Sequence, residues 1–253
     1  MFTVNHFIWI AICLVIIGVL TFCSIKFKFS FKTAAIIMAG VSLVSELVKV
    51  FTHMKFVNGV DASDGMVINA GSLPLHICSM FIFVFFWLPF SKDSKFRRYI
   101  LNFLVPIGTI GGLLAILMAT SGVNFARPFA YQCFIYHAVM IWFVIYLIKF
   151  KYVDLGIKTW IINMISLFAL SIIMIWVNGA LAVYDTNFLY VVKPPVDGLP
   201  LLNLDNGWFA YYFTLVAIGV LAITLLHLPF MIKEIINKRK AKSNKQGAEP
   251  SKQ

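Results

Sequence analysis

Charged side chains are scarce in this sequence. Of its 253 residues, 12% are charged and 61% are hydrophobic, whereas a soluble domain carries about 25% charged residues. This composition argues against a soluble globular protein and indicates a chain that lies largely in lipid.

Long apolar runs recur along the whole chain, and we interpret seven of them as transmembrane helices. A hydrocarbon core of roughly 30 Å needs about 17 or more residues of helix, and helices are expected because lipid offers no partners for free backbone groups. The connectors are too short for a separate soluble domain. The sequence therefore predicts an all-α, polytopic, seven-helix bundle formed by residues 7–25, 34–53, 74–90, 100–119, 130–148, 159–178 and 208–231.

The sequence lacks the features of a cleaved signal peptide and an internal repeat, and both absences restrict the class of membrane protein. The opening residues "MFTVNHF" have no basic n-region, and no A-x-A-like site follows the first apolar run. We therefore expect a retained helix rather than a cleaved signal peptide. No internal repeat is apparent, which argues against the inverted-repeat architecture of many transporters.

The basic residues gather on one side of the predicted bundle. The net charge is +11, yet 17 of the 21 Lys and Arg residues fall in the connectors after the first, third and fifth runs or at and after Lys233. Basic residues mark the cytoplasmic side, so we expect an external N-terminus and a cytoplasmic C-terminus. This placement gives no reason to expect a nucleic-acid partner.

The last segment is polar and basic. We expect residues 1–232 to form the transmembrane domain and residues 233–253 to form a disordered cytoplasmic tail that is attracted to anionic lipid headgroups. The expected location is the cell membrane, with the bacterial cytoplasmic membrane favoured. The sequence makes no prediction of the oligomeric state.

Cysteine is also rare, and its spacing excludes two common uses. The four cysteines all lie in predicted spans, and no C-x-x-C or His/Cys metal spacing occurs. Neither a zinc site nor a disulfide scaffold is indicated, and no metal or cofactor is expected.

Polar residues within the spans gather at one depth. With the predicted topology and a rise of 1.5 Å per residue, they lie in the outer half of the bundle, whereas the inner halves of the third, fifth and sixth helices are almost wholly apolar. The distribution predicts a polar cavity open toward the outside or the outer leaflet. Its candidate residues are Glu46, Lys49, His76, Cys78, Ser79, Gln132, Cys133, His137 and Asn178.

Glu46 and Lys49 share a helix face and can form an ion pair. A charge deep in a membrane helix costs several kcal/mol, so the pair is expected to face the bundle. Two roles stay open: an internal ion pair that fixes helix packing, and a substrate- or proton-binding site.

The stretch "LPLHICS", residues 73–79, begins the third run. Ser72 can cap a helix and Pro74 is tolerated in a first turn, so the helix is expected to start there. His76 and Cys78 would then differ by about 200° around the helix. A catalytic Cys78 would need its base from another helix.

His137 is the natural candidate for that base, since a thiolate activated by histidine suits acyl transfer through a thioester. Other interpretations stay open. A membrane cysteine is usually a small buried hydrophobe, and membrane histidines often bridge helices. Cys133 lies four residues before His137 on the same face and is a rival thiol.

The external connector between the last two runs is long and rich in aromatic and aliphatic residues. We expect it to fold over the outer opening as a lid, or to form an ordered interfacial loop anchored by Tyr190 and Trp208.

Together, "LPLHICS", a histidine in the fifth helix, "N-x7-TNFLYVVKPP" from Asn178 to Pro195 and "DNGWFAYY" resemble the YwaF-like family of bacterial multipass membrane proteins. That family is similar to a eukaryotic multipass enzyme that moves acyl chains onto ether lysophospholipids with a membrane cysteine and a histidine. The resemblance implies that Cys78 is the nucleophile and His137 the general base. Phe188 stands where the family commonly has tyrosine.

Two hypotheses follow. The first is a lipid acyltransferase or lipid ester hydrolase acting on glycerophospholipids or lysolipids, with a membrane lipid as substrate and no cofactor. The second is a non-catalytic transporter or sensor with a small polar or lipid ligand in the outer cavity. For either, the expected ligand-binding residues are Glu46, Lys49, His76, Ser79, Asn178, Asn187, Tyr190 and Lys193.

Overall fold

The computed structural model describes residues 2–59, 62–68, 70, 73–119, 122–195, 199 and 201–246. Within these residues the fold is helical apart from one hairpin, which confirms a polytopic all-α membrane protein. Its α-helices are α1 (Val4–Lys26), α2 (Phe31–His53), α3 (Ile77–Trp87), α4 (Lys95–Met118), α5 (Pro128–Lys149), α6 (Ile157–Ala180) and α7 (Gly207–Gln246). The short elements are the strands β1 (Met54–Gly59) and β2 (Ala62–Ile68) and the 3-10 turns η2 (Leu88–Phe90), η3 (Ala182–Tyr184) and η4 (Phe188–Tyr190).

Six of the helices in the described part of the chain are long and apolar enough to cross a membrane. The exception is α3, which was expected to cover residues 74–90. Ser72 lies outside the described residues, and Pro74 falls in a turn before the helix. The helix begins only at Ile77, with His76 in extended conformation as its N-cap. With η2 it runs from Ile77 to Phe90, about 21 Å at 1.5 Å per residue, which is too short for the whole hydrocarbon core.

The connector after α2 and the C-terminal part of α7 also differ from expectation. The connector after α2 forms an antiparallel hairpin in which Met54 pairs with Ile68. At the other end α7 does not stop near residue 231. It continues to Gln246, through most of the segment expected to be disordered, because no Gly or Pro interrupts that stretch and Lys238 forms an i,i+4 ion pair with Glu234.

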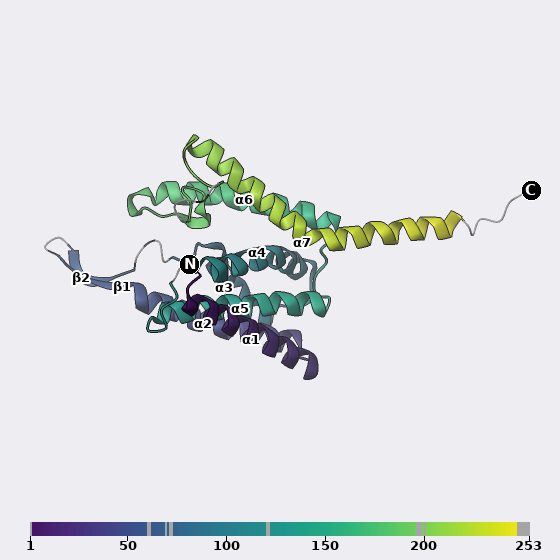
Figure 1. Ribbon diagram of the computed structural model, residues 1–253, viewed down its shortest axis with the longest axis horizontal. Helices are drawn as coiled ribbons and strands as arrows, with labels where there is room; N and C mark the ends of the chain where they lie inside the picture. Colours follow the sequence, from purple (N-terminus) through teal and green to yellow (C-terminus); the bar gives the residue numbers. More distant parts are fainter. Residues whose placement is uncertain are drawn as a thin grey trace, which may run out of the picture.

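The helices form two layers. Figure 1 shows α6 and α7 side by side on one side of α4, with α1, α2, α3 and α5 on the other, while the C-terminal part of α7 extends away from the bundle. The core follows α5, whose aromatic residues Trp142, Phe143 and Tyr146 are almost fully buried. Small residues allow neighbouring helices to pack closely against α5. Ala34 and Ala35 of α2, for example, are fully buried in the same cluster.

A polar seam in the inner half joins the two layers. The amide nitrogen of Asn163 donates to the carbonyl of Asn102 (3.0 Å) and to Nε2 of His227 (3.1 Å). The Nδ1–H of His227 in turn donates to the carbonyl of Leu155 (2.8 Å). The expectation of an almost wholly apolar inner half is therefore wrong for α6, because one buried amide there satisfies groups on both α4 and α7.

The close approach of α4 to α5 depends on a glycine. A Cβ at Gly112 would lie 2.9 Å from Cγ1 of Ile141, whereas a Cβ at Gly111 would meet nothing within 4 Å. We expect Gly112→Leu to lower the free energy of unfolding by about 1–3 kcal/mol through overpacking. Gly111→Leu, the matched control, should stay close to the parent protein. Heating the detergent-solubilised protein and measuring the monodisperse fraction tests this, and equal losses would contradict the packing.

Candidate functional site

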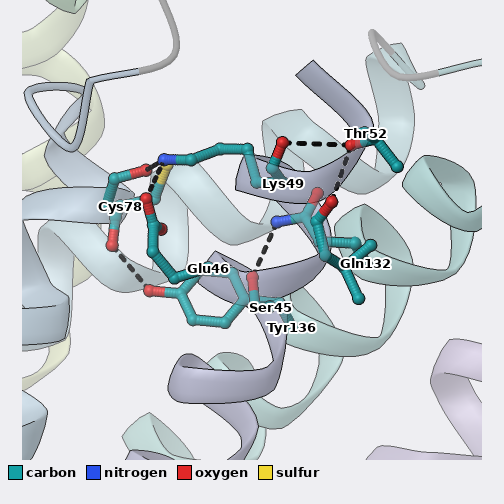
Figure 2. Close-up of polar contacts among 9 residues, drawn as sticks. Ser45, Glu46, Lys49, Thr52, Cys78, Gln132 and Tyr136 are labelled. Carbon is teal, nitrogen blue, oxygen red and sulfur yellow. Dashed lines mark hydrogen bonds and ion pairs between the residues drawn. The ribbon is translucent and has the colours of Figure 1, made fainter. Parts of the chain in front are cut away.

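The Glu46–Lys49 ion pair connects α2 to the first turn of α3. Nζ of Lys49 lies 2.5 Å from Oε1 of Glu46, and it also donates to Oγ of Ser79 at 3.3 Å. Figure 2 shows the Lys49 side chain reaching across to the Cys78 segment. The pair thus supports helix packing and at the same time lies beside the candidate nucleophile.

Helix α5 also bonds to the first turn of α3, the turn that α2 contacts through Lys49. The Tyr136 hydroxyl donates to the backbone carbonyl of Cys78 at 2.6 Å, and the amide of Gln132, one turn earlier, donates to Oγ of Ser45 at 2.7 Å (Figure 2). Sequence reasoning missed Tyr136 and Ser45. The available signal was the i,i+4 spacing of Gln132 and Tyr136, which gives α5 a polar face at the depth of Cys78.

Accessibility separates the cysteines. Cys13 and Cys133 are buried, whereas Cys78 and Cys23 are partly exposed. Cys23 lies in the last turns of α1, close to the basic connector that begins at Lys26. Cys78 is therefore the partly exposed thiol that lies beside Lys49, Ser79 and Tyr136.

His137 is buried, and its described hydrogen bonds go to its own helix. Its Nδ1 lies 2.7 Å from the carbonyl oxygen of Cys133 and 3.7 Å from the Cys133 sulfur. A carbonyl can only accept, so Nδ1 carries the hydrogen and Nε2 is the basic nitrogen. These contacts bring His137 to Cys133, while the neighbouring Tyr136 reaches Cys78, and the Cys78–His137 pair stays a prediction.

The external connector folds onto the start of α3. The His76 ring lies 5.2 Å from the Phe188 ring and 5.6 Å from the Tyr190 ring, measured between centroids. Burial raises the pKa of the Tyr190 hydroxyl above its ordinary value, and the nearby Cys78 thiol acts in the same direction. Residues 186–193, which we call the lid, thus pack against His76 at the start of α3, two residues before the candidate nucleophile.

Asparagines hold the backbone of the lid. Asn178, near the end of α6, accepts from the Phe188 amide (2.8 Å) and donates to the Phe188 carbonyl (3.0 Å). Asn187 donates to the carbonyl of Lys193 (2.8 Å) and accepts from its amide (3.2 Å). Both residues were expected to bind a ligand, and the structure gives both of them bonds to the lid. Lys193 forms a partly exposed ion pair with Asp185 (2.8 Å).

The lid contains two residues in a left-handed conformation. Leu189 has a φ of 56° and Tyr190 a φ of 54°, values that are rare for bulky side chains and that persist only where the surroundings impose them. The Tyr211 hydroxyl donates to the carbonyl of Tyr190, and the Trp208 indole donates to the carbonyl of Val191 (2.9 Å). The expected anchoring by Trp208 is confirmed, and the α7 aromatics hold the strained segment.

One buried hydroxyl remains available in the lid. Thr186 is 5% exposed, and its Oγ1 has no hydrogen-bond partner among the residues that the structure describes. Buried polar atoms are rarely left unpaired, so Thr186 is a candidate to contact a ligand. Within the same described ranges, no group of three or more His, Cys, Asp or Glu side chains is arranged to hold a metal ion.

A family model described as the TMEM164 family matches residues 1–227. The chain belongs to the TMEM164 family. This is a family of multipass membrane proteins, in agreement with the helices described above. No curated protein and no solved structure matches the chain.

The matched region contains α1 to α6, the lid and most of the apolar part of α7. It therefore includes both the Cys78 turn and the lid that packs against the start of α3. The basic end of α7 lies beyond the match.

Charge pairing at the site is testable by a double-mutant cycle. Glu46→Gln or Lys49→Met alone leaves a largely buried group without its partner, and we expect each to lower the free energy of unfolding by about 3 kcal/mol. The double variant should recover much of that loss because neither charge remains. Thermal denaturation in detergent measures all four proteins, and additive losses in the double variant would show that the two side chains do not act as a pair.

The role of Asn178 can be tested on one amide. We expect Asn178→Ala to raise the hydrogen-exchange rate of the Phe188 amide about tenfold or more, because loss of a buried hydrogen bond costs about 1–3 kcal/mol. Asn203→Ala is the matched control, since Asn203 accepts from a single exposed amide, that of Asp205. An unchanged Phe188 exchange rate would contradict the anchoring of the lid.

Proposed function

We propose that this TMEM164-family protein transfers acyl chains between membrane lipids through a thioester on Cys78. The observation that carries the proposal is that Lys49 and Tyr136 both bond to the turn that holds the partly exposed Cys78, Lys49 at Oγ of Ser79 and Tyr136 at the backbone carbonyl of Cys78. In the reaction, Sγ of Cys78 attacks the ester carbonyl of a glycerophospholipid. The C–O bond breaks, and the thiol proton passes to the leaving lysolipid oxygen.

The second half of the reaction releases the chain. The hydroxyl of an acceptor lysolipid attacks the thioester carbonyl, its proton returns to the Cys78 sulfur, and a new ester forms. With water in place of the acceptor the product is a free fatty acid, which makes the protein a lipid ester hydrolase. His137 is the proposed carrier of the proton in both halves, through the Nε2 that its bond to Cys133 leaves basic.

Several features support a reactive thiolate at Cys78. The residue lies in the first turn of α3, where the positive end of the helix dipole favours a negative charge. The Lys49 ammonium at the neighbouring Ser79 adds a positive charge. The same ammonium is suited to a lipid phosphate or to the oxyanion that develops on the attacked carbonyl.

The proposed setting is the bacterial cytoplasmic membrane, with the lid outside and the basic end of α7 inside. The concentration of Lys and Arg on the predicted inner side supports this orientation. In that orientation the lipid reaches Cys78 from the outer leaflet, with His76, Ser79 and the lid residues Asn187, Tyr190 and Lys193 near its headgroup.

A ligand-binding protein without catalysis is the second candidate. The observation that favours it is the contact of His137 with Cys133 rather than with Cys78 in the described hydrogen bonds. On this alternative the Glu46–Lys49 pair, His76 and Thr186 bind a small polar or lipid ligand beneath the lid, and no covalent intermediate forms.

Acylation of individual cysteines distinguishes the two candidates. In nanodiscs containing phosphatidylcholine, we expect the parent protein to gain the mass of one acyl chain and to lose it in neutral hydroxylamine, as a thioester does. Cys78→Ala should abolish the adduct because it removes the sulfur, while Cys23→Ala, which removes the other partly exposed thiol, should leave it intact. Intact-protein mass spectrometry gives the readout.

Three results would change the assignment. An adduct retained by Cys78→Ala but lost in Cys133→Ala would make Cys133 the nucleophile. No adduct in any variant, with lipid binding retained, would favour the ligand-binding protein. Full lipid transfer by folded Cys78→Ala would end the proposed mechanism.

A further inference from the structure

A cavity of about 440 Å³ lies between α3, α4 and α6. We call it the inter-layer groove, because it separates the α6–α7 layer from the helices that hold Cys78. On α6 its lining extends from Ile162 to Ile173, which corresponds to about 16 Å along the helix. The lining is almost entirely apolar, with Asn163 and Ser166 toward the inner end.

The groove penetrates the bundle. Phe81 is only 5% exposed and Asn163 only 1%, yet both line it. A narrow groove with an almost wholly apolar lining suits a thin apolar chain better than a whole helix about 10 Å across. The surrounding membrane is a source of such chains.

The outer end of the groove meets the candidate site. Ile77, which directly precedes Cys78, lines the groove, as does Phe81, three residues after Cys78 on an overlapping face of α3. Met80 also lines it and packs on the cluster formed by Phe188 and Val191 of the lid. The outer end of the groove therefore lies next to the helical turn that holds Cys78, and next to the lid residues on which Met80 packs.

The inner end of the groove is polar. Both hydrogens of the Asn163 amide nitrogen are used, one by the Asn102 carbonyl and one by His227. This fixes the side-chain orientation and leaves Oδ1 buried without a partner in the described part of the chain. An apolar chain end gains nothing beside an unpaired carbonyl oxygen, so the apolar section ends near Asn163.

We propose that the inter-layer groove holds the fatty acyl chain of the lipid that reacts at Cys78, with the carbonyl end at Cys78 and the methyl end toward Asn163. This inference rests on the proposed acyl transfer. It adds that the length of the groove determines which acyl-chain lengths the protein prefers. Ala169 is the critical position, because this small side chain lines the groove about midway between Ile162 and Ile173. Ala169 is exposed at the open side of the groove, and a large side chain there is expected to lie across the inner half and to leave the outer half open.

The first test compares two matched variants. Ala169→Phe should lower the rate of Cys78 acylation from palmitoyl- and oleoyl-phosphatidylcholine relative to the hexanoyl lipid by about tenfold or more, the discrimination expected of an apolar pocket. Ala217→Phe places the same ring at a position of α7 that is likewise exposed and is not part of the groove lining, and it should leave the preference unchanged. A thioester that forms with the same chain preference in both variants would overturn the groove assignment.

The second test does not require catalysis. Cys78→Ala protein is placed in nanodiscs with phosphatidylcholine that carries a photoreactive diazirine at the methyl end of its acyl chain. Cross-links should map to α6 between Ile162 and Ile173, falling about tenfold with added Ala169→Phe but not with Ala217→Phe. Cross-links only on outward-facing residues would overturn the inference. Groove cross-links in Cys78→Ala, combined with the absence of any thioester in the parent protein, would reject the acyl transfer and retain the chain-binding site.

Discussion

The ion pair between Glu46 and Lys49 is the interaction on which the outer half of the molecule depends. Either charge alone would be costly at this depth, and each offsets the other at 2.5 Å. Since Lys49 also bonds to Ser79, the pair fixes the first turn of α3 against α2. Cys78 is the residue directly before Ser79. The lysine that neutralises Glu46 on α2 therefore also places a positive charge near Cys78.

The fifth helix supplies the remaining constraints. Its inner half is the centre of the core, and Gly112 lets α4 approach it closely. Its outer half presents Tyr136 to the Cys78 carbonyl and, one residue later, fastens the His137 ring to Cys133. One rigid helix therefore sets the depth of both the candidate nucleophile and the candidate base, and a tightly packed scaffold positions such groups better than a loop.

The sequence predicted the features that depend on composition. Lipid selects for long apolar helices, so six of the seven expected spans appear as helices long enough to cross a membrane. The start of α3 was wrong because the hydrophobic run alone does not reveal that residues 73–76 are held outside the helix, with His76 packed against the lid.

The candidate site was predicted in part for the same reason. The i,i+3 spacing of Glu46 and Lys49 is a local property of one helix, and their pairing followed from it. The bond from Tyr136 to Cys78 joins two helices far apart in sequence, and the left-handed Leu189 and Tyr190 are imposed by tertiary contacts. The spacing of Gln132 and Tyr136 indicates a polar face on α5 but not its partner on α3, and the left-handed conformation of Leu189 and Tyr190 leaves no mark in the local pattern.

Polar contacts at two depths explain why an apolar groove persists between the two helix layers. At the inner end, Asn163 joins α6 to both α4 and α7. At the outer end, Asn178 holds the lid to α6, and the lid rests on His76 at the start of α3. The layers are thus fastened at both ends, and between the fastenings the apolar faces of α3, α4 and α6 leave a cavity. An apolar groove that ends near the Cys78 turn therefore follows from where the polar residues are placed, without any residue dedicated to opening it.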